Sequence, residues 1–316
     1  MALFSRLAAG AGLAAALLAH PASAQEYPER PVEFIVPWSP GGGSDTLMRI
    51  IANNVSPYLG VEMPVINMPG VGGTVGLKEA SRRDADGYTI SQVHEGLLAA
   101  TETGLTDLSW DDFEPIALLT SSPQYLVTGS DAPYETFEGL VEYAQANPGE
   151  LTIGVTLGGV PHLHAAMIAD AFDLDWKYVG YEGTGERIRA LVGGNLDLAI
   201  GDIASSLQFV ENGDLVFLAT GATERMEQTP DVPTLTELGA ELDLAITRGI
   251  VMPKGASEDR QATLEAALRE LSEDETFVEQ INNAGAEVAF RGQDEYTTYL
   301  SNLSDTVQRL AEVIAP

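Results

Sequence analysis

Two glycine-rich stretches of this sequence have the composition of anion-binding turns. The first follows the apolar run 32–36 and precedes the run 46–59, whose apolar residues recur at helical spacing. Its residues are Trp38, Ser39, Pro40, Gly41, Gly42, Gly43, Ser44 and Asp45. Glycines let a backbone approach a ligand closely, and the amides and dipole of a helix N-terminus attract negative charge. We therefore predict a carboxylate-binding loop at this strand-to-helix turn.

The competing interpretation is that this turn only lets a strand lead into a helix. Phosphate fits the loop less well than carboxylate, because the loop lacks both the Lys-Ser/Thr pair of a P-loop and the GxGxxG spacing of a dinucleotide turn. Ser44 or Asp45 can cap the helix, and a cap is the role we expect for Asp45. Trp38 is either a wall of the site or a core residue.

A second turn of the same design lies between a predicted strand, 151–155, and a predicted helix, 162–172. Its candidate ligand-binding residues are Thr156, Gly158, Gly159, Val160 and His162. Two such turns that face each other across a cleft would hold opposite sides of one small molecule. His162 either donates a hydrogen bond to the ligand or caps the turn. His162 and His164 do not indicate a metal site, because residues i and i+2 lie on different faces of a helix.

The elements around these turns predict how they are brought together. Strands alternate with helices along the chain, which is typical of a parallel α/β architecture whose ligands bind at the carboxyl ends of strands. His94 lies where the strand that follows Gly87 should end, and Asp202 follows the predicted strand 196–200. Both are candidates for the same rim. Asp202 could accept a hydrogen bond from a ligand hydroxyl or ammonium group, or only cap the next helix.

The composition restricts the class of partner. The 316 residues include 47 acidic and 16 basic side chains and no cysteine, for a formal net charge of −31. This charge argues against nucleic acid or an anionic membrane surface as partner. Without cysteine, neither a disulfide framework nor a lipid-anchored N-terminal cysteine is possible. The long-range field also repels an anionic ligand, so binding must depend on local donors in a partly desolvated cleft.

The N-terminus is typical of a secretory signal peptide. Arg6 precedes an apolar run, 7–19, and Pro21-Ala22-Ser23-Ala24 has the form of a signal peptidase site. We expect residues 1–24 to be removed near Ala24 and the mature protein to be periplasmic.

The mature chain is long enough for two domains. We expect the first to be discontinuous and to consist of residues 25–122 and 247–316, with residues 123–246 forming the second. The chain would cross between them near 121–123 and return near 246–252.

Several motifs together resemble a known family. They are, in order, Tyr27-Pro28-Glu29-Arg30-Pro31, the WSPGGGSD loop, NMPGVGGTVG at 67–76, DADGYTI at 84–90, GTGERIRALVGGNLDLAI at 183–200 and TPDVPTLTELG at 229–239. In this order the sequence is similar to the Bug-type, TctC-like substrate-binding proteins of tripartite tricarboxylate transporters. The resemblance implies a two-lobed Venus-flytrap fold, in which two doubly wound α/β domains are joined by crossing strands. It also implies that both turns hold a ligand carboxylate, with His94 and Asp202 at further rim positions.

The resemblance implies an extracytoplasmic receptor that captures an organic carboxylate and delivers it to membrane subunits encoded as separate chains. The family's ligands are mostly tricarboxylates, dicarboxylates, acidic amino acids and aromatic acids, and the sequence does not indicate which of these binds here. We expect a monomer without cofactor or metal. We also expect no enzymatic activity, since a hydrolase would need an activated nucleophile and the sequence has no cysteine and no GxSxG nucleophile elbow. The alternative is a binding protein that signals to a sensor kinase.

The chain departs from the family pattern in two places. The second turn has fewer small polar residues than the common form, with Leu157 and Val160. The stretch before Gly249 often carries an aromatic residue in the family, whereas this chain has Thr247-Arg248. We expect an exposed Arg248 near the crossing segment. The alternative is that Arg248 faces the cleft and pairs with a distal carboxylate of the ligand.

Overall fold

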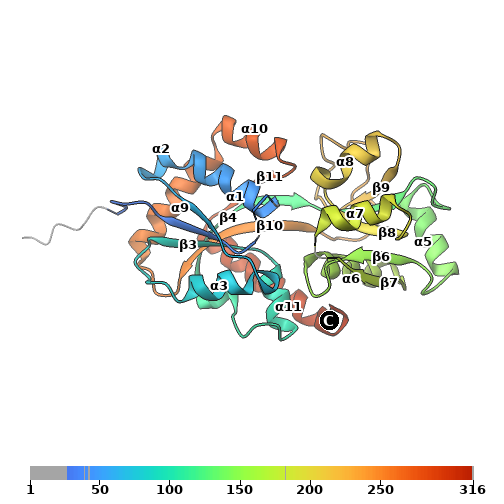
Figure 1. The fold of residues 1–316 in the computed structure, drawn as a ribbon, viewed down its shortest axis with the longest axis horizontal. Helices are drawn as coiled ribbons and strands as arrows, with labels where there is room; N and C mark the ends of the chain where they lie inside the picture. Colours follow the sequence, from blue (N-terminus) through green and yellow to red (C-terminus); the bar gives the residue numbers. More distant parts are fainter. Residues whose placement is uncertain (1–26, 39, 42, 182, 315–316) are drawn as a thin grey trace, which may run out of the picture.

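The chain folds into two lobes, each built on a β-sheet flanked by helices (Figure 1). The computed structural model describes residues 27–38, 40, 41, 43–181 and 183–314. The first sheet has six strands in the order β11-β4-β10-β3-β1-β2, and the second has five in the order β7-β6-β8-β5-β9. This arrangement confirms the predicted two-lobed α/β fold.

The first sheet consists of β1 (Glu33–Val36), β2 (Val65–Asn67), β3 (Thr89–Val93), β4 (Phe113–Pro123), β10 (Ala245–Pro253) and β11 (Glu287–Arg291). The second consists of β5 (Tyr125–Gly129), β6 (Thr152–Val155), β7 (Lys177–Gly180), β8 (Leu198–Gly201) and β9 (Leu215–Thr220). The first lobe carries α1 (Gly43–Asn54), α2 (Ser56–Leu59), η1 (Val71–Gly73), α3 (Thr74–Ser81), α4 (Gly96–Glu102), η2 (Trp110–Asp112), α9 (Glu258–Ser272), α10 (Glu275–Asn283) and α11 (Gln293–Ile314). The second lobe carries α5 (Phe137–Ala146), α6 (Val160–Phe172), α7 (Thr184–Val192) and α8 (Ile203–Glu211). Within the described residues, no helix combines the length and the apolar character needed to cross a bilayer.

Each sheet mixes parallel and antiparallel strands. In the first sheet β1 pairs in parallel with β2 and β3, whereas β10 runs antiparallel to β3 and β4. In the second sheet β6, β7 and β8 are parallel and β5 is antiparallel to its neighbours. The parallel strands therefore bring their carboxyl ends to one edge of each sheet, at Val36, Asn67 and Val93 in the first lobe and Val155 and Gly201 in the second.

Two strands connect the lobes. The chain leaves the first sheet at Pro123 and enters the second at Tyr125, and the amide of the intervening Gln124 donates to Leu244 O at 2.8 Å. Immediately after Leu244 the chain enters β10, which pairs with β4 from its first residue to its last. The outgoing and returning segments thus run side by side through the connection (Figure 1).

The single helix predicted over 46–59 is wrong, because the segment forms two helices. Helix α1 ends at Asn54, and α2 begins at Ser56 with Pro57 in its first turn. A proline within a continuous helix would lack an amide donor and clash with the carbonyl one turn earlier, but it is tolerated in a first turn. The chain therefore breaks just before Pro57 and restarts.

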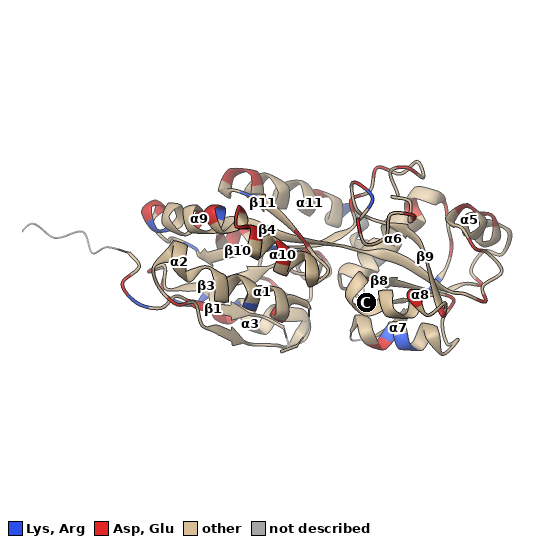
Figure 2. Cartoon of the chain, turned by 90° about the horizontal axis from the view of Figure 1, so that it is seen from above, with Lys and Arg blue, Asp and Glu red and all other residues tan. Residues whose placement is uncertain are grey.

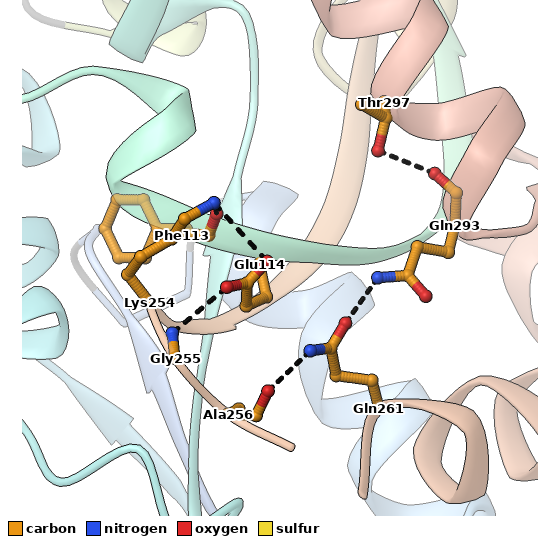
Figure 3. A network of polar contacts seen from close by, with 8 residues as sticks. All are labelled: Phe113, Glu114, Lys254, Gly255, Ala256, Gln261, Gln293 and Thr297. Carbon is orange, nitrogen blue, oxygen red and sulfur yellow. Dashed lines mark hydrogen bonds and ion pairs between the residues drawn. The ribbon is translucent and has the colours of Figure 1, made fainter. Parts of the chain in front are cut away.

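The C-terminal helices pack against the first sheet. Leu268 of α9 and Phe277 of α10 belong to the same buried apolar cluster as Phe34 of β1. Polar contacts link the helices to the strand ends (Figure 3): Gln293, at the start of α11, donates to Gln261 of α9, which in turn donates to the carbonyl of Ala256 at 2.6 Å. The chain thus returns to the lobe in which it began.

Candidate functional site

The first glycine-rich loop lies at the carboxyl edge of the first sheet and is organised by Asp45. The Asp45 carboxylate accepts hydrogen bonds from the amide of Gly41 at 2.8 Å, from Arg49 Nε at 2.9 Å and from Asn67 Nδ2 at 2.8 Å. Burial acts to raise the pKa of Asp45, but these hydrogen bonds outweigh it and lower that pKa below its usual value. The cap role expected for Asp45 is wrong, because α1 begins at Gly43 and places Asp45 inside its first turn.

One amide of the loop is bound within the loop, and the amides at the start of α1 have no partner within their own helix. Gly41 N–H is committed to Asp45, whereas the amides at the start of α1 have no carbonyl one turn earlier to bind. Pro40, Gly41 and Gly43 are exposed, and Ser44 is nearly buried. Ser39 and Gly42, which were also predicted to bind ligand, lie outside the described residues, as does the expected signal peptide.

Trp38 and His94 form a stacked pair at the rim. Their ring centroids are 4.0 Å apart with an interplanar angle of 24°. The Trp38 ring also lies over Gly73, where an added Cβ would come within 2.9 Å of it. His94 Nδ1 accepts from the amide of Gly96 at 2.8 Å, and burial together with nearby Arg248 lowers the pKa of His94 to about 3. The turns that follow β1, β2 and β3 therefore meet around a neutral imidazole.

The second glycine-rich turn is closed by its own hydrogen bonds. The amide of Gly159 donates to Thr156 O at 2.9 Å, and the amide of Gly158 donates to His162 Nδ1 at 3.2 Å. Gly158 has φ +69°, which favours glycine, and α6 begins at Val160. His162 thus caps the turn, which is one of the two roles considered for it, and its ring also contacts Tyr178.

Asp202 stands at the same edge of the second lobe, directly after β8. Its carboxylate accepts from the amide of Ser205 at 2.8 Å and from the Ser205 hydroxyl at 2.6 Å, so it caps α8. His164 is buried inside α6. The described residues contain no group of three or more His, Cys, Asp or Glu side chains placed to hold a metal ion.

The sequence reasoning missed a buried arginine in the second lobe. Arg187 of α7 has no exposed surface. Its guanidinium donates to the carbonyl of Ile200, to Thr156 Oγ1 at 3.3 Å and to Thr184 Oγ1 at 3.0 Å. It therefore lies beneath the second turn. One signal could have identified it: Arg187 stands four residues before Leu191, on the apolar face of a predicted helix.

Arg248 occupies the corresponding place in the first lobe, and the expectation that it is exposed is wrong. Only 5% of its surface is exposed, because β10 runs in the interior of the sheet beneath the first loop. Its Nε donates to Ser44 Oγ at 3.2 Å, and its Nη1 donates to Ser122 Oγ at 2.8 Å and to Ile246 O at 3.1 Å. The remaining nitrogen, Nη2, lies against Gly43, 3.4 Å from where a Cβ would be.

Both arginines are buried charges with neutral hydrogen-bond partners. None of the ion pairs formed among the described residues includes Arg187 or Arg248. Burial lowers the pKa of each guanidinium to about 10, so both stay charged at neutral pH. The negative charge of Asp202 acts to raise the pKa of both guanidinium groups, and that of Glu95 acts to raise the pKa of Arg248. A buried charge without an ionic partner is unfavourable, so these sites favour an approaching anion.

The two lobes touch close to the elements that carry these residues. On one side, Leu163 and Ala166 of α6 belong to an apolar cluster with Leu97 of α4 and Leu300 of α11 (Figure 1). The contact joins the second lobe to the core of the first.

On the other side the contact is polar and small. Gln228 of the second lobe donates to Asn282 O at 3.3 Å, and a Cβ at Gly285 would lie 3.5 Å from the amide nitrogen of Ala204 in α8. Asp202 of the second lobe is also near enough to Arg248 of the first for its negative charge to act to raise the pKa of that arginine.

Comparisons with known proteins identify relatives of the whole chain. The family model described as the tripartite tricarboxylate transporter family receptor, TctC, matches residues 47–315. A protein from Cupriavidus necator is 30% identical over 97% of this chain and 95% of its own, and the BugT protein of Bordetella pertussis is 28% identical over 96% and 94%. Among solved structures, a TctC solute-binding protein from Polaromonas is 26% identical with a TM-score of 0.78, covering 90% of this chain and 99% of its own. MatC from Rhodopseudomonas palustris with bound malate is also 26% identical, with a TM-score of 0.73 and coverages of 91% and 100%.

Proposed function

The chain belongs to the TctC family of tripartite tricarboxylate transporter receptors, and from this premise we propose that it captures an organic carboxylate between its lobes. Membership confirms the resemblance indicated by the sequence motifs. Proteins of this family are receptors without enzymatic activity. The ligand proposed here is therefore bound and released unchanged.

One observation carries the proposal: in each lobe a glycine-rich turn, a helix N-terminus and a buried arginine lie together at the carboxyl edge of the sheet. The N-terminus of α1 and Arg248 belong to the first lobe, and the turn before α6 and Arg187 belong to the second. Amides and helix dipoles favour anions, and guanidinium groups match the planar geometry of carboxylates. The related MatC structure, which contains malate, supports the same class of ligand.

The proposed mechanism is capture by closure of the lobes. A ligand that contacts both edges favours the closed state, because those contacts form together only there. Charge-assisted hydrogen bonds contribute about 1.5 to 3 kcal/mol each. A few of them, less the cost of closure and of lost ligand freedom, reach the roughly 8 kcal/mol that corresponds to micromolar affinity.

We further propose that the protein acts in the periplasm and that its closed form delivers the ligand to membrane subunits encoded as separate chains. The family description supports this role, since it names a receptor of a transporter. On this proposal residues 1–24 serve only for export.

A thermal-shift screen tests the proposal. We expect at least one compound among dicarboxylates, tricarboxylates, aromatic acids and acidic amino acids to raise the melting temperature of the wild type. In Gly159→Val the ligand-induced shift should be lost, because a Cβ at Gly159 would lie 3.2 Å from Thr156 O and displace the turn. Its control, Gly139→Val in the outer helix α5, would place the Cβ at an ordinary 3.4 Å from Tyr134 Cβ and should keep the shift. Enzymatic turnover of an acid, or an unchanged shift in Gly159→Val, would contradict the proposal.

A further inference from the structure

We propose that Arg248 is a specificity-determining residue that contacts a carboxylate of the ligand directly, and that the receptor consequently prefers acids with two carboxylates to acids with one. The inference rests on the proposed function and names the residue that restricts the ligand class.

The Arg248 side chain is buried and hydrogen-bonded to neutral groups. It is 5% exposed, and within the described part of the chain its hydrogen bonds use Nε and Nη1, with two serine hydroxyls and one carbonyl as acceptors. These acceptors are neutral, so they form hydrogen bonds with the guanidinium without compensating its positive charge. Hydrogen bonds to neutral groups offset only part of the cost of removing a guanidinium from water, and an ionic partner would offset more.

The third guanidinium nitrogen of Arg248, Nη2, points toward the start of α1. Nη2 lies against Gly43, the first residue of α1. A carboxylate placed there would receive hydrogen bonds from Arg248 and from amides at the start of α1, which have no carbonyl one turn earlier in the helix. A side chain at position 43 would occupy this space, which gives the glycine a reason beyond backbone flexibility.

Each lobe contributes one buried cation. The first edge holds Arg248 and the second holds Arg187, and neither has an ion-pair partner among the described residues. Arg187 is fully enclosed and acts on the cleft through its field, whereas Arg248 is placed for contact. Asp202 and Glu95 partly offset these charges from a distance. A ligand with two separated negative charges matches the two cations better than a ligand with one.

The experiment compares acids of equal chain length by isothermal titration calorimetry: succinate with butyrate, glutarate with pentanoate, and adipate with hexanoate. We expect wild-type protein to bind at least one diacid at least about 30-fold more tightly than its monoacid partner. In Arg248→Met the diacid affinity should fall at least about 100-fold, and most of the preference should disappear. Arg248→Lys keeps the charge but loses the planar donor pair, so it should lie between the two.

A matched control and a stability measurement separate binding from structure. Arg225→Met removes the same charge from an exposed ion pair with Glu237 and should bind like wild type. The melting temperature of ligand-free Arg248→Met should stay close to that of the wild type, because removal of a buried charge opposes the loss of its three hydrogen bonds. A lower melting temperature with equal loss of both acids would show a structural role and overturn the inference.

The remaining outcomes distinguish this inference from the proposed function. If the wild type binds monoacids and diacids equally well, or if Arg248→Met retains the diacid preference, the inference fails while the receptor function stands. If the wild type binds no carboxylate in either this experiment or the thermal-shift screen, both fail.

Discussion

His164 lies in the interior of α6 as a neutral imidazole. It is 3% exposed, and burial, together with the charge of Arg187, lowers its pKa from 6.5 to about 3. Between these two pKa values the unfolded chain binds a proton at this site and the folded protein does not. The contribution of neutral His164 to the free energy of unfolding is therefore fully present above pH 6.5 and is lost as the pH falls toward 3.

We expect His164→Leu to reduce the acid sensitivity of folding. Between pH 7 and pH 5 the free energy of unfolding of the wild type should fall by about 2 kcal/mol more than that of the variant, at about 1.4 kcal/mol for each pH unit below 6.5. Urea unfolding at the two pH values measures the difference. Parallel loss of stability in both proteins would show that His164 becomes charged in the folded state.

Individual side chains mark how far the sequence could predict the site. The loops, His94 and Asp202 were predicted from strand ends and turn composition, which are local features, and whether they bind ligand stays a prediction. The burial of Arg248 could not be predicted from neighbouring residues in the sequence. Its burial depends on β10 pairing with β4 and β3, strands more than a hundred residues away in the sequence. Arg187 was missed for a related reason, because two of its three acceptors, Ile200 and Thr156, lie outside its own helix.

At the scale of elements, α8 is the part of the second lobe that meets the first lobe on its polar side. Ala204 in its first turn is exposed and stands next to Gly285. Strand-to-helix units such as this one were predictable, since apolar runs and helical periodicity identify them. Their contacts across the lobes were not, because neither partner carries an apolar pattern that requires the other.

We expect Ala204→Trp to hold the lobes apart on this side. The indole would occupy the space against Gly285, so ligand affinity should fall about tenfold or more while the ligand-free protein keeps its stability to within about 0.5 kcal/mol. Calorimetric titration and thermal unfolding measure the two quantities. Gln208→Trp, one turn further along the same helix and also exposed, is the control and should bind normally. Equal affinities for the two variants would show that closure does not bring α8 against Gly285.

At the scale of the whole molecule, negative charge surrounds a site proposed for an anion. Acidic residues occur along the helices of both lobes (Figure 2), and the formal net charge is −31. At long range this field repels a carboxylate, whereas the arginines and amides act only within the cleft. The two effects are separable, because salt screens charges in water far more strongly than buried ones.

The association rate constant for a dicarboxylate should therefore rise with salt. Between about 10 and 150 mM NaCl the screening length falls from roughly 30 to 8 Å, and we expect the rate constant to increase about two- to tenfold. Stopped-flow fluorescence can follow binding through Trp38, which stacks on His94 at the rim, and Trp38→Phe identifies that signal. A rate constant that decreases with salt would mean that the arginine field already dominates outside the cleft.

The contacts between the lobes are unequal on their two sides. Separating α6 from α4 and α11 would expose Leu163 and its apolar neighbours to water, at about 25 cal/mol for each Å² of apolar surface. Separating α8 from the segment around Gly285 breaks one long hydrogen bond, between Gln228 and Asn282, whose groups water can satisfy. On the proposed mechanism of closure, the lobes would therefore separate on the side of α8 and stay in contact on the side of α6.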